Sequence, residues 1–117
     1  MGPIAILTGA SSGIGAAAAE QFVECGFTVI NISRRDCPVP GVETLATDLA
    51  DEQSAARTCT ALAAKVSDAG GAPVCLVHNA SLMLKDQCDT TEDADLSRVL
   101  SVNVVGINSL NLSLIHI

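Results

Sequence analysis

Short apolar runs alternate with stretches of helical periodicity along most of this chain. Continuous apolar runs at residues 3–7, 27–32 and 74–77 predict buried strands, and a shorter strand is expected at 42–46. The strand at 74–77 is apolar throughout and is therefore expected to be central in the complete sheet, with its outer edge left open in this chain. Strands separated by helices favour right-handed parallel crossovers. The pattern predicts an α/β fold with a parallel sheet. Its sequence of elements resembles the first half of a Rossmann-type doubly wound sheet, which implies an incomplete sheet with the strand order 3-2-1-4.

The intervening segments have the spacing of amphipathic helices. A first helix is expected over residues 16–25 and ends at Gly26, and its apolar face begins at residue 14. A second helix begins after the N-cap candidate Asp51 and stops at Gly70. A polar stretch at 86–95 precedes a last helix, expected from about Leu96. The residues expected on the buried faces of the first two helices are Ile14, Ala17, Ala18, Phe22 and Cys25, and Ala55, Cys59, Leu62, Ala63 and Val66.

Composition limits the architecture and the class of partner. The 117 residues suffice for one domain, and Phe22 and Phe27 are the only aromatic residues, so the core is expected to be aliphatic. A formal net charge of −7 argues against nonspecific nucleic-acid binding. No apolar run approaches the length of a membrane span and no signal segment is visible, so no membrane association and a cytoplasmic location are expected.

The five cysteines do not form a metal-binding pattern. Their number is odd, no pair has C-x-x-C spacing, and neither His78 nor His116 has ligand-like spacing to them, so no metal site is expected. Cys25, Cys59 and Cys75 fall at apolar positions and are expected to be small buried residues in a reducing compartment.

A glycine-rich turn, Thr8-Gly9-Ala10-Ser11-Ser12-Gly13-Ile14-Gly15, joins the first strand to the first helix. Gly9 allows a sharp turn, Gly13 allows a phosphate to approach the backbone, and Gly15 allows the helix to pack closely. The free N–H groups of the first helical turn favour an anion. The turn therefore predicts a dinucleotide site, with Gly9, Ser11, Ser12, Gly13, Ile14 and Gly15 as cofactor-binding residues.

Polar side chains follow each predicted strand. Thr8, Ser33, Asp48 and Asn79 all lie at or just beyond strand carboxyl ends, and in a parallel sheet these ends meet at one edge. The second strand ends in Ser33-Arg34-Arg35, without the acid that would hold the ribose 2′-hydroxyl of NAD. A guanidinium can instead clamp a 2′-phosphate, so NADP is predicted, with Arg34 as the main contact and Ser33 assisting. The alternatives are a solvated arginine pair and, because Asp36 is near, NAD.

The pattern T-G-x-x-x-G-x-G resembles the fingerprint of the short-chain dehydrogenase/reductase family. The resemblance implies that Asp48 and Leu49 contact the adenine and that Asn79 and Ala80 contact the ribose, although His78-Asn79-Ala80-Ser81 stands where the family has N-N-A-G. His78 is expected to be a hydrogen-bonded histidine at a strand end. Asn103, in Val-Asn-Val-Val-Gly, matches a family asparagine that bends a helix and supports a proton relay; the alternative is a core asparagine bonded to nearby backbone.

The family implies hydride transfer between NADP(H) and a carbonyl or secondary alcohol, with a tyrosine in Y-x-x-x-K as proton donor. The sequence contains no tyrosine, and its only lysines are Lys65 and Lys85, so the fragment itself is expected to be inactive. The full-length protein is expected to pair through the helix that begins near Leu96. The alternative is a non-catalytic nucleotide-binding module or a nonfunctional truncated product.

The last six residues differ in character from the rest. Residues 112–117, Leu-Ser-Leu-Ile-His-Ile, resemble the translation of an adapter used in DNA library preparation, although they could also continue an apolar helix. The expected organisation is therefore an NADP-binding domain over residues 1–111 and a non-native tail over 112–117.

Overall fold

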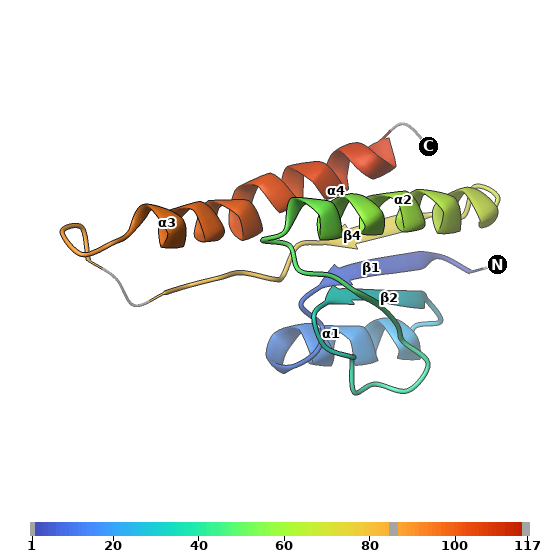
Figure 1. The fold of residues 1–117 in the computed structure, drawn as a ribbon. Coiled ribbons are helices and arrows are strands. Elements are labelled where there is room, and N and C mark those ends of the chain that lie inside the picture. The colour runs from blue at the N-terminus through green and yellow to red at the C-terminus, as the bar shows by residue number, and fades with distance from the viewer. Residues whose placement is uncertain (1, 85–86, 116–117) are drawn as a thin grey trace.

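The computed structural model describes residues 2–84 and 87–115. Four parallel strands, β1 (Ile4–Thr8), β2 (Thr28–Ser33), β3 (Glu43–Ala46) and β4 (Val74–Val77), form one sheet in the order β3-β2-β1-β4 (Figure 1). Ile4 pairs with Thr28 of β2 on one side and with Val74 of β4 on the other. The predicted α/β fold and the predicted strand order are therefore confirmed.

Helices cover both faces of the sheet. Figure 1 shows α1 (Gly13–Glu24) on one face, and α2 (Glu52–Asp68) and α4 (Gly106–Ile115) on the other. The predicted N-cap of α2 is confirmed, because an Asp51 carboxylate oxygen accepts a hydrogen bond from Gln53 N–H at 3.0 Å. The last helix begins as α3 (Asp93–Leu100), three residues before the predicted start, and continues through a π-helical turn, η1 (Ser101–Val105), into α4.

The strands divide the core into two layers because successive side chains point to opposite faces. One cluster contains Ala5, Leu7 and Val29 and packs against Ala19 of α1. The other contains Ile4, Ile6, Ile30 and Ile32 and packs against Leu62 of α2 and Leu110 of α4. Both clusters are aliphatic, apart from the partly buried phenylalanines beside the first, as the composition predicts.

The predicted buried face of α1 is partly wrong. Ile14, with 83% of its surface exposed, Ala17 and Cys25 all face solvent. The helix instead buries a face one position further along, consisting of Gly15, Ala18, Ala19, Phe22 and Val23. The alanine-rich sequence fits either rotation, and the close contact of Gly15 with the preceding turn selects the observed one.

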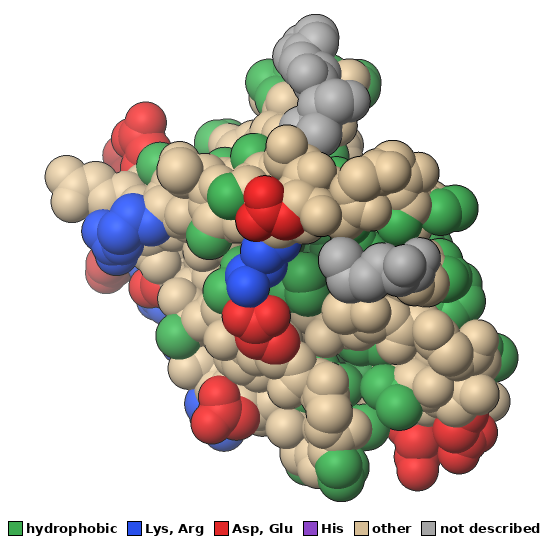
Figure 2. Space-filling model, turned by 90° about the vertical axis from the view of Figure 1, so that its right-hand side faces the viewer, with side chains coloured by type: hydrophobic (Ala, Val, Ile, Leu, Met, Phe, Trp, Pro, Cys, Tyr) green, Lys and Arg blue, Asp and Glu red, His purple; other side chains and the backbone are tan. Residues whose placement is uncertain are grey.

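Strand β4 lies at an edge of this sheet, as the predicted strand order 3-2-1-4 requires. Val74 and Cys75 are consequently exposed. The predicted burial of Cys75 is therefore wrong, and so is that of Cys25 at the end of α1, whereas Cys59 is half-buried and its thiol donates to the Ser109 carbonyl at 3.6 Å. Figure 2 views the end of the molecule at which the strands begin, where hydrophobic side chains lie exposed among charged ones.

The last helix is longer and more apolar than the sequence pattern indicated. Asp93–Ile115 is continuous over 23 residues and contains an 18-residue window of mean hydropathy 1.3, enough by length and composition alone to cross a membrane. The prediction that no segment reaches that length is therefore wrong. The helix packs along α2, burying Gly106 and Leu110, and Leu114 contacts the core. Residues 112–115 thus continue α4, whereas residues 116 and 117 of the expected tail lie outside the described residues.

Candidate nucleotide-binding site

The turn after β1 requires glycine at its first position. Gly9 has a φ of +74°, and its N–H donates to the Ile32 carbonyl at 3.0 Å, which ties the turn to the end of β2. A Cβ at Gly9 would also lie 3.0 Å from the Ala80 Cα, closer than side chains normally approach backbone. The predicted sharp turn is therefore confirmed, and it brings the ends of β1, β2 and β4 together.

The amino end of α1 is packed against this turn and open on its outer side. A Cβ at Gly15 would overlap the Gly9 carbonyl oxygen and would lie 2.6 Å from Asn79 Nδ2, so only glycine fits there. Ser12 is the N-cap, but its side chain makes no capping hydrogen bond within the described residues, and Ser12, Gly13 and Ile14 are exposed. The N–H groups of the first turn are thus left accessible to an anion, beside the half-buried Ser11.

The end of β4 is fastened to the end of β1 by three hydrogen bonds. The Thr8 hydroxyl accepts from Asn79 N–H at 3.0 Å and from Ala80 N–H at 2.9 Å, and Asn79 Nδ2 donates to the Gly9 carbonyl at 3.1 Å. Asn79 therefore braces the glycine turn. His78 lies at 2.8 Å, Nε2 to Oδ1, from Asn111 of α4, which agrees with the expected hydrogen-bonded histidine at a strand end.

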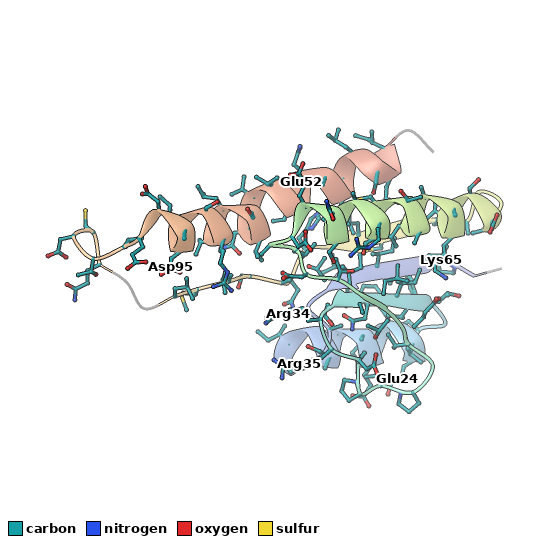
Figure 3. All side chains as sticks on the ribbon, viewed as in Figure 1. Glu24, Arg34, Arg35, Glu52, Lys65 and Asp95 are labelled. Carbon is teal, nitrogen blue, oxygen red and sulfur yellow. The ribbon has the colours of Figure 1, made fainter. Side chains whose placement is uncertain are left out.

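The turn after β2 presents arginine to the same edge of the sheet. Figure 3 shows Arg34 and Arg35 beyond the carboxyl end of β2, at the end of the sheet where α1 begins. Arg34 is exposed and forms no salt bridge with any described residue. The Ser33 hydroxyl donates to the Arg35 carbonyl and accepts from Asn31 Nδ2 at 2.9 Å, so its single proton is already used inside the turn. Of the two residues predicted to meet a 2′-phosphate, Arg34 is the better placed.

The carboxylate of Asp48 is held in place just beyond β3. One of its oxygens accepts from Ala50 N–H at 2.9 Å, and its own N–H donates to the Ser54 hydroxyl at 2.9 Å. The second carboxylate oxygen has no partner among the residues described here and can accept a hydrogen bond from an amino group. This arrangement fits the role that the family resemblance implies for Asp48 with an adenine.

A cleft of about 140 Å³ joins these strand ends. Six of the predicted cofactor-binding residues line it: Gly9, Ser33, Arg34, Asp48, Leu49 and Ala80. Ser11, Ser12, Gly13 and Ile14 lie in the turn and at the start of α1, and Gly15 and Asn79 support the cleft from behind Gly9. The sequence analysis did not select the other lining residues, which are Ile32, Thr47, Ala50, Leu82, Arg98 and Val102.

Arg98 is the most consequential of the missed residues. It lies on α3, and Val102 follows it by four positions, so both face the cleft from one side of the helix. Arg98 is exposed and, within residues 2–84 and 87–115, forms no salt bridge. The four-residue spacing between Arg98 and Val102 is the only signal of this role in the sequence. The sequence alone does not show that α3 reaches the ends of the strands.

Asn103 lies in the π-helical turn and contacts the loop after β4. Its Oδ1 accepts from Leu82 N–H at 2.8 Å, and its Nδ2 donates to the Leu82 carbonyl at 2.9 Å. The side chain thus matches the alternative interpretation, an asparagine bonded to nearby backbone. The π-helical turn (Ser101–Val105) interrupts the regular helix at Asn103, where the family resemblance implies a bend.

A parallel sheet with a glycine-rich turn, an open helix terminus and a cleft at the strand ends defines a dinucleotide-binding Rossmann-type protein. The family model for short chain dehydrogenases matches residues 3–115, and the chain therefore belongs to that family of oxidoreductases. A search of curated proteins found no match.

Solved structures of this family have the same fold. An oxidoreductase of the short chain dehydrogenase/reductase family from Brucella ovis, in complex with a partially ordered NAD, is 27% identical with a TM-score of 0.87, covering 99% of this chain and 57% of its own. A short-chain dehydrogenase/reductase from Burkholderia vietnamiensis is 27% identical with a TM-score of 0.85 and coverages of 96% and 55%. Thermoplasma acidophilum aldohexose dehydrogenase is 26% identical with a TM-score of 0.83 and coverages of 98% and 44%. The chain thus spans about half the length of these proteins.

Proposed function

We propose that this chain is the cofactor-binding part of an NADP(H)-dependent oxidoreductase. The observation that carries the choice of cofactor is Arg34, which lines the cleft without an ion-pair partner in the described part of the chain. Ser33 occupies the place where an acid would hold the 2′-hydroxyl of NAD, so no carboxylate there repels a 2′-phosphate. A guanidinium recognises phosphate with paired, charge-assisted hydrogen bonds.

The residues present fit a bound dinucleotide. The open first turn of α1 would hold the pyrophosphate, Arg34 the 2′-phosphate and the free oxygen of Asp48 the adenine amino group, with Leu49 and Ala80 beside the adenosine. The lack of a side chain at Gly15 lets α1 pack directly against the glycine turn, so the first turn of α1 lies close enough to the strand ends to contact the pyrophosphate. The cofactor supplies the hydride, and the protein supplies binding and orientation.

The substrate class follows from the family. We propose hydride transfer to or from a carbonyl or secondary alcohol, with Asn103 supporting the site by fixing the Leu82 loop. The family's proton donor is a tyrosine, and the 117 residues contain none. These residues alone are therefore expected to bind the cofactor without turnover.

Titration of the 117-residue chain with NADPH and NADH, followed by the fluorescence of the reduced nicotinamide, tests the cofactor assignment. NADPH is expected to bind at least roughly tenfold more tightly, because a 2′-phosphate contact with a cation is worth about 1.5–3 kcal/mol. The preference should shrink as salt is added, since exposed charges are screened. Equal affinities, or a preference for NADH, would support the alternative cofactor NAD.

A non-catalytic nucleotide-binding module is the second candidate function, because the cofactor-binding residues described above would serve it equally well. The two proposals differ in what longer versions of the protein do. NADPH oxidation with a panel of aldehydes and ketones, measured on a protein extended through a Tyr-x-x-x-Lys segment, is expected if the protein is an enzyme. Tight NADPH binding with no oxidation by that longer protein would favour the module.

The exposed face of the last helix is proposed to mediate self-association of a cytoplasmic protein. Leu96, Leu100 and Val104 follow one another at intervals of four residues, and each exposes about half of its surface, at 48%, 47% and 56%. Such a stripe is typical of a helix that pairs with a partner. Sedimentation of the chain and of Leu100→Lys tests this proposal, because the variant should remain monomeric at concentrations where the parent dimerises. Equal sedimentation of the two proteins would contradict it.

A further inference from the structure

A fully buried asparagine lies between the two turns that form the cleft. Asn31, in the middle of β2, has none of its surface exposed and shares its sheet face with Val29, Ala5 and Leu7. An amide in such an aliphatic layer costs free energy unless all its groups are paired. The partners of Asn31 therefore explain why the fold tolerates it.

The oxygen of Asn31 holds the glycine-rich turn. Its Oδ1 accepts a hydrogen bond from Ala10 N–H at 2.9 Å. Ala10 follows Gly9 directly and is itself fully buried. The bond therefore fixes the part of the turn that leads into the amino end of α1, where a pyrophosphate would be held.

The nitrogen of Asn31 holds the arginine turn. Its Nδ2 lies 2.9 Å from Ser33 Oγ and 3.2 Å from the Arg35 carbonyl oxygen, and both atoms can accept. The Ser33 hydroxyl also donates to the Arg35 carbonyl, so two donors converge on this one carbonyl and close the turn that contains Arg34. The direction in which the backbone presents Arg34 to the cleft thus depends on the Asn31 amide.

A third contact extends the same network to β3. Asn31 Nδ2 lies 3.1 Å from Thr44 Oγ1, which also accepts from Cys37 N–H at 3.2 Å. The chain is therefore anchored again just after the arginine turn. Within residues 2–84 and 87–115, the hydrogen bonds of the Asn31 side chain end on the glycine turn, the arginine turn and this anchor.

We propose that Asn31 is a positioning residue for cofactor selection, which holds the 2′-phosphate-binding turn in register with the pyrophosphate-binding turn. This inference rests on the proposed NADP function. An aliphatic side chain of similar volume would fill the same space in the core, but it would leave Ala10 N–H and the Arg35 carbonyl without these partners. The role of Asn31 is therefore expected to appear in cofactor preference, beyond any effect on stability.

Asn31→Asp separates the two ends of the amide. The new side chain can still accept from Ala10 N–H, but it carries at most one proton where the amide nitrogen carries two, so it cannot replace the donations toward Ser33, Arg35 and Thr44. The variant is expected to bind NADPH roughly tenfold more weakly, as for the loss of a charge-assisted contact, while its affinity for NADH changes by less than about threefold. The preference for NADPH should thus largely disappear.

Val29→Ala is the matched control, because Val29 is buried on the same strand and face but belongs to the apolar cluster. It should lower the thermal unfolding midpoint and leave the ratio of the two dissociation constants unchanged. If Asn31→Asp does not fold, Thr44→Val gives the second test, since it removes one acceptor of the amide from a half-buried position and should reduce the same ratio.

The outcomes separate the inference from the function on which it rests. A parent chain without preference for NADPH overturns the proposed function, and the inference with it. The inference alone is overturned if the parent chain prefers NADPH and Asn31→Asp retains the same ratio of the NADH and NADPH dissociation constants. Where Asn31→Asp is unfolded, the same conclusion follows from a retained ratio in Thr44→Val. If Val29→Ala also loses the preference for NADPH over NADH, that preference depends on the stability of the fold, and the inference is overturned as well.

Discussion

The side chain of Asn103 and the backbone of Leu82 are joined by two reciprocal hydrogen bonds, of 2.8 and 2.9 Å. Leu82 lines the cleft, and Asn103 lies in the π-helical turn, 21 residues further along the chain. The pair therefore attaches the loop after β4 to the last helix. It does so at the point where the family resemblance implies that the asparagine acts.

Asn103→Ala is expected to lower the free energy of unfolding by about 2–3 kcal/mol, because it removes both bonds and leaves the Leu82 N–H and carbonyl unpaired. Urea denaturation followed by circular dichroism measures this change. NADPH binding should weaken as well, since the Leu82 wall of the cleft is released. Asn108→Ala is the control, because Asn108 is an exposed residue on the same helix. Equal effects of the two substitutions would contradict the role assigned to the pair.

Arg34→Asp is expected to weaken NADPH binding far more than NADH binding, at a cost of about 2–5 kcal/mol for NADPH. The substitution removes a charge-assisted contact and places a carboxylate against the 2′-phosphate. Titration with both cofactors measures the difference. Arg35→Asp changes the net charge equally at a neighbour that does not line the cleft, and it should leave the preference intact. An equal loss for both cofactors in Arg34→Asp would remove the 2′-phosphate assignment.

Gly9→Ala and Gly70→Ala should differ strongly in stability although both place alanine at a positive φ, of +74° and +63°. The backbone strain common to both is about 1–2 kcal/mol. Only at Gly9 would the new Cβ meet other atoms, at 3.0 Å from the Ala80 Cα, whereas nothing lies within 4 Å at Gly70. Thermal unfolding should show the larger loss for Gly9→Ala. Similar losses would mean that the turn can move away from Ala80.

Arg98→Ala is expected to weaken NADPH binding by roughly fivefold, as for one exposed cation at the rim of a charged site. Arg57→Ala is the control, since Arg57 is exposed on α2 and does not line the cleft. Both variants change the net charge by one. Isothermal titration at two salt concentrations distinguishes local from general electrostatics, and identical affinities of the two variants would exclude a contact with Arg98.

Val74→Lys is expected to reduce aggregation of the 117-residue chain. Val74 is the first residue of the edge strand β4 and is 37% exposed, and an apolar edge invites pairing with other chains. Light scattering during incubation measures the effect. Leu112→Lys adds the same charge to an exposed apolar position on α4 and should help less. If the two variants aggregate equally, net charge is responsible and the strand edge is not.

The sequence predicted most of the fold because its local signals agree with one another. Apolar runs, the N-cap at Asp51 and the glycine turn are short-range patterns, and the structure places the strands within about one residue of their predicted bounds. The errors lie where burial depends on a neighbour. The alanines of α1 fit two rotations of the helix equally well, so the sequence did not fix which face would be buried.

The candidate site divides in the same way. Gly9, Arg34 and Asp48 were identifiable because a turn, a strand end and a charge are visible in the order of residues. Arg98 and the network of Asn31 were not, because they depend on which elements pack together, as in the hydrogen bond between Asn31 and Ala10, 21 residues apart. The sequence by itself determined the turn, the strands and the family to which they belong. Only the tertiary structure decided that an arginine of α3 shares the cleft and that one buried amide joins its two turns, because packing sets these contacts and local pattern does not.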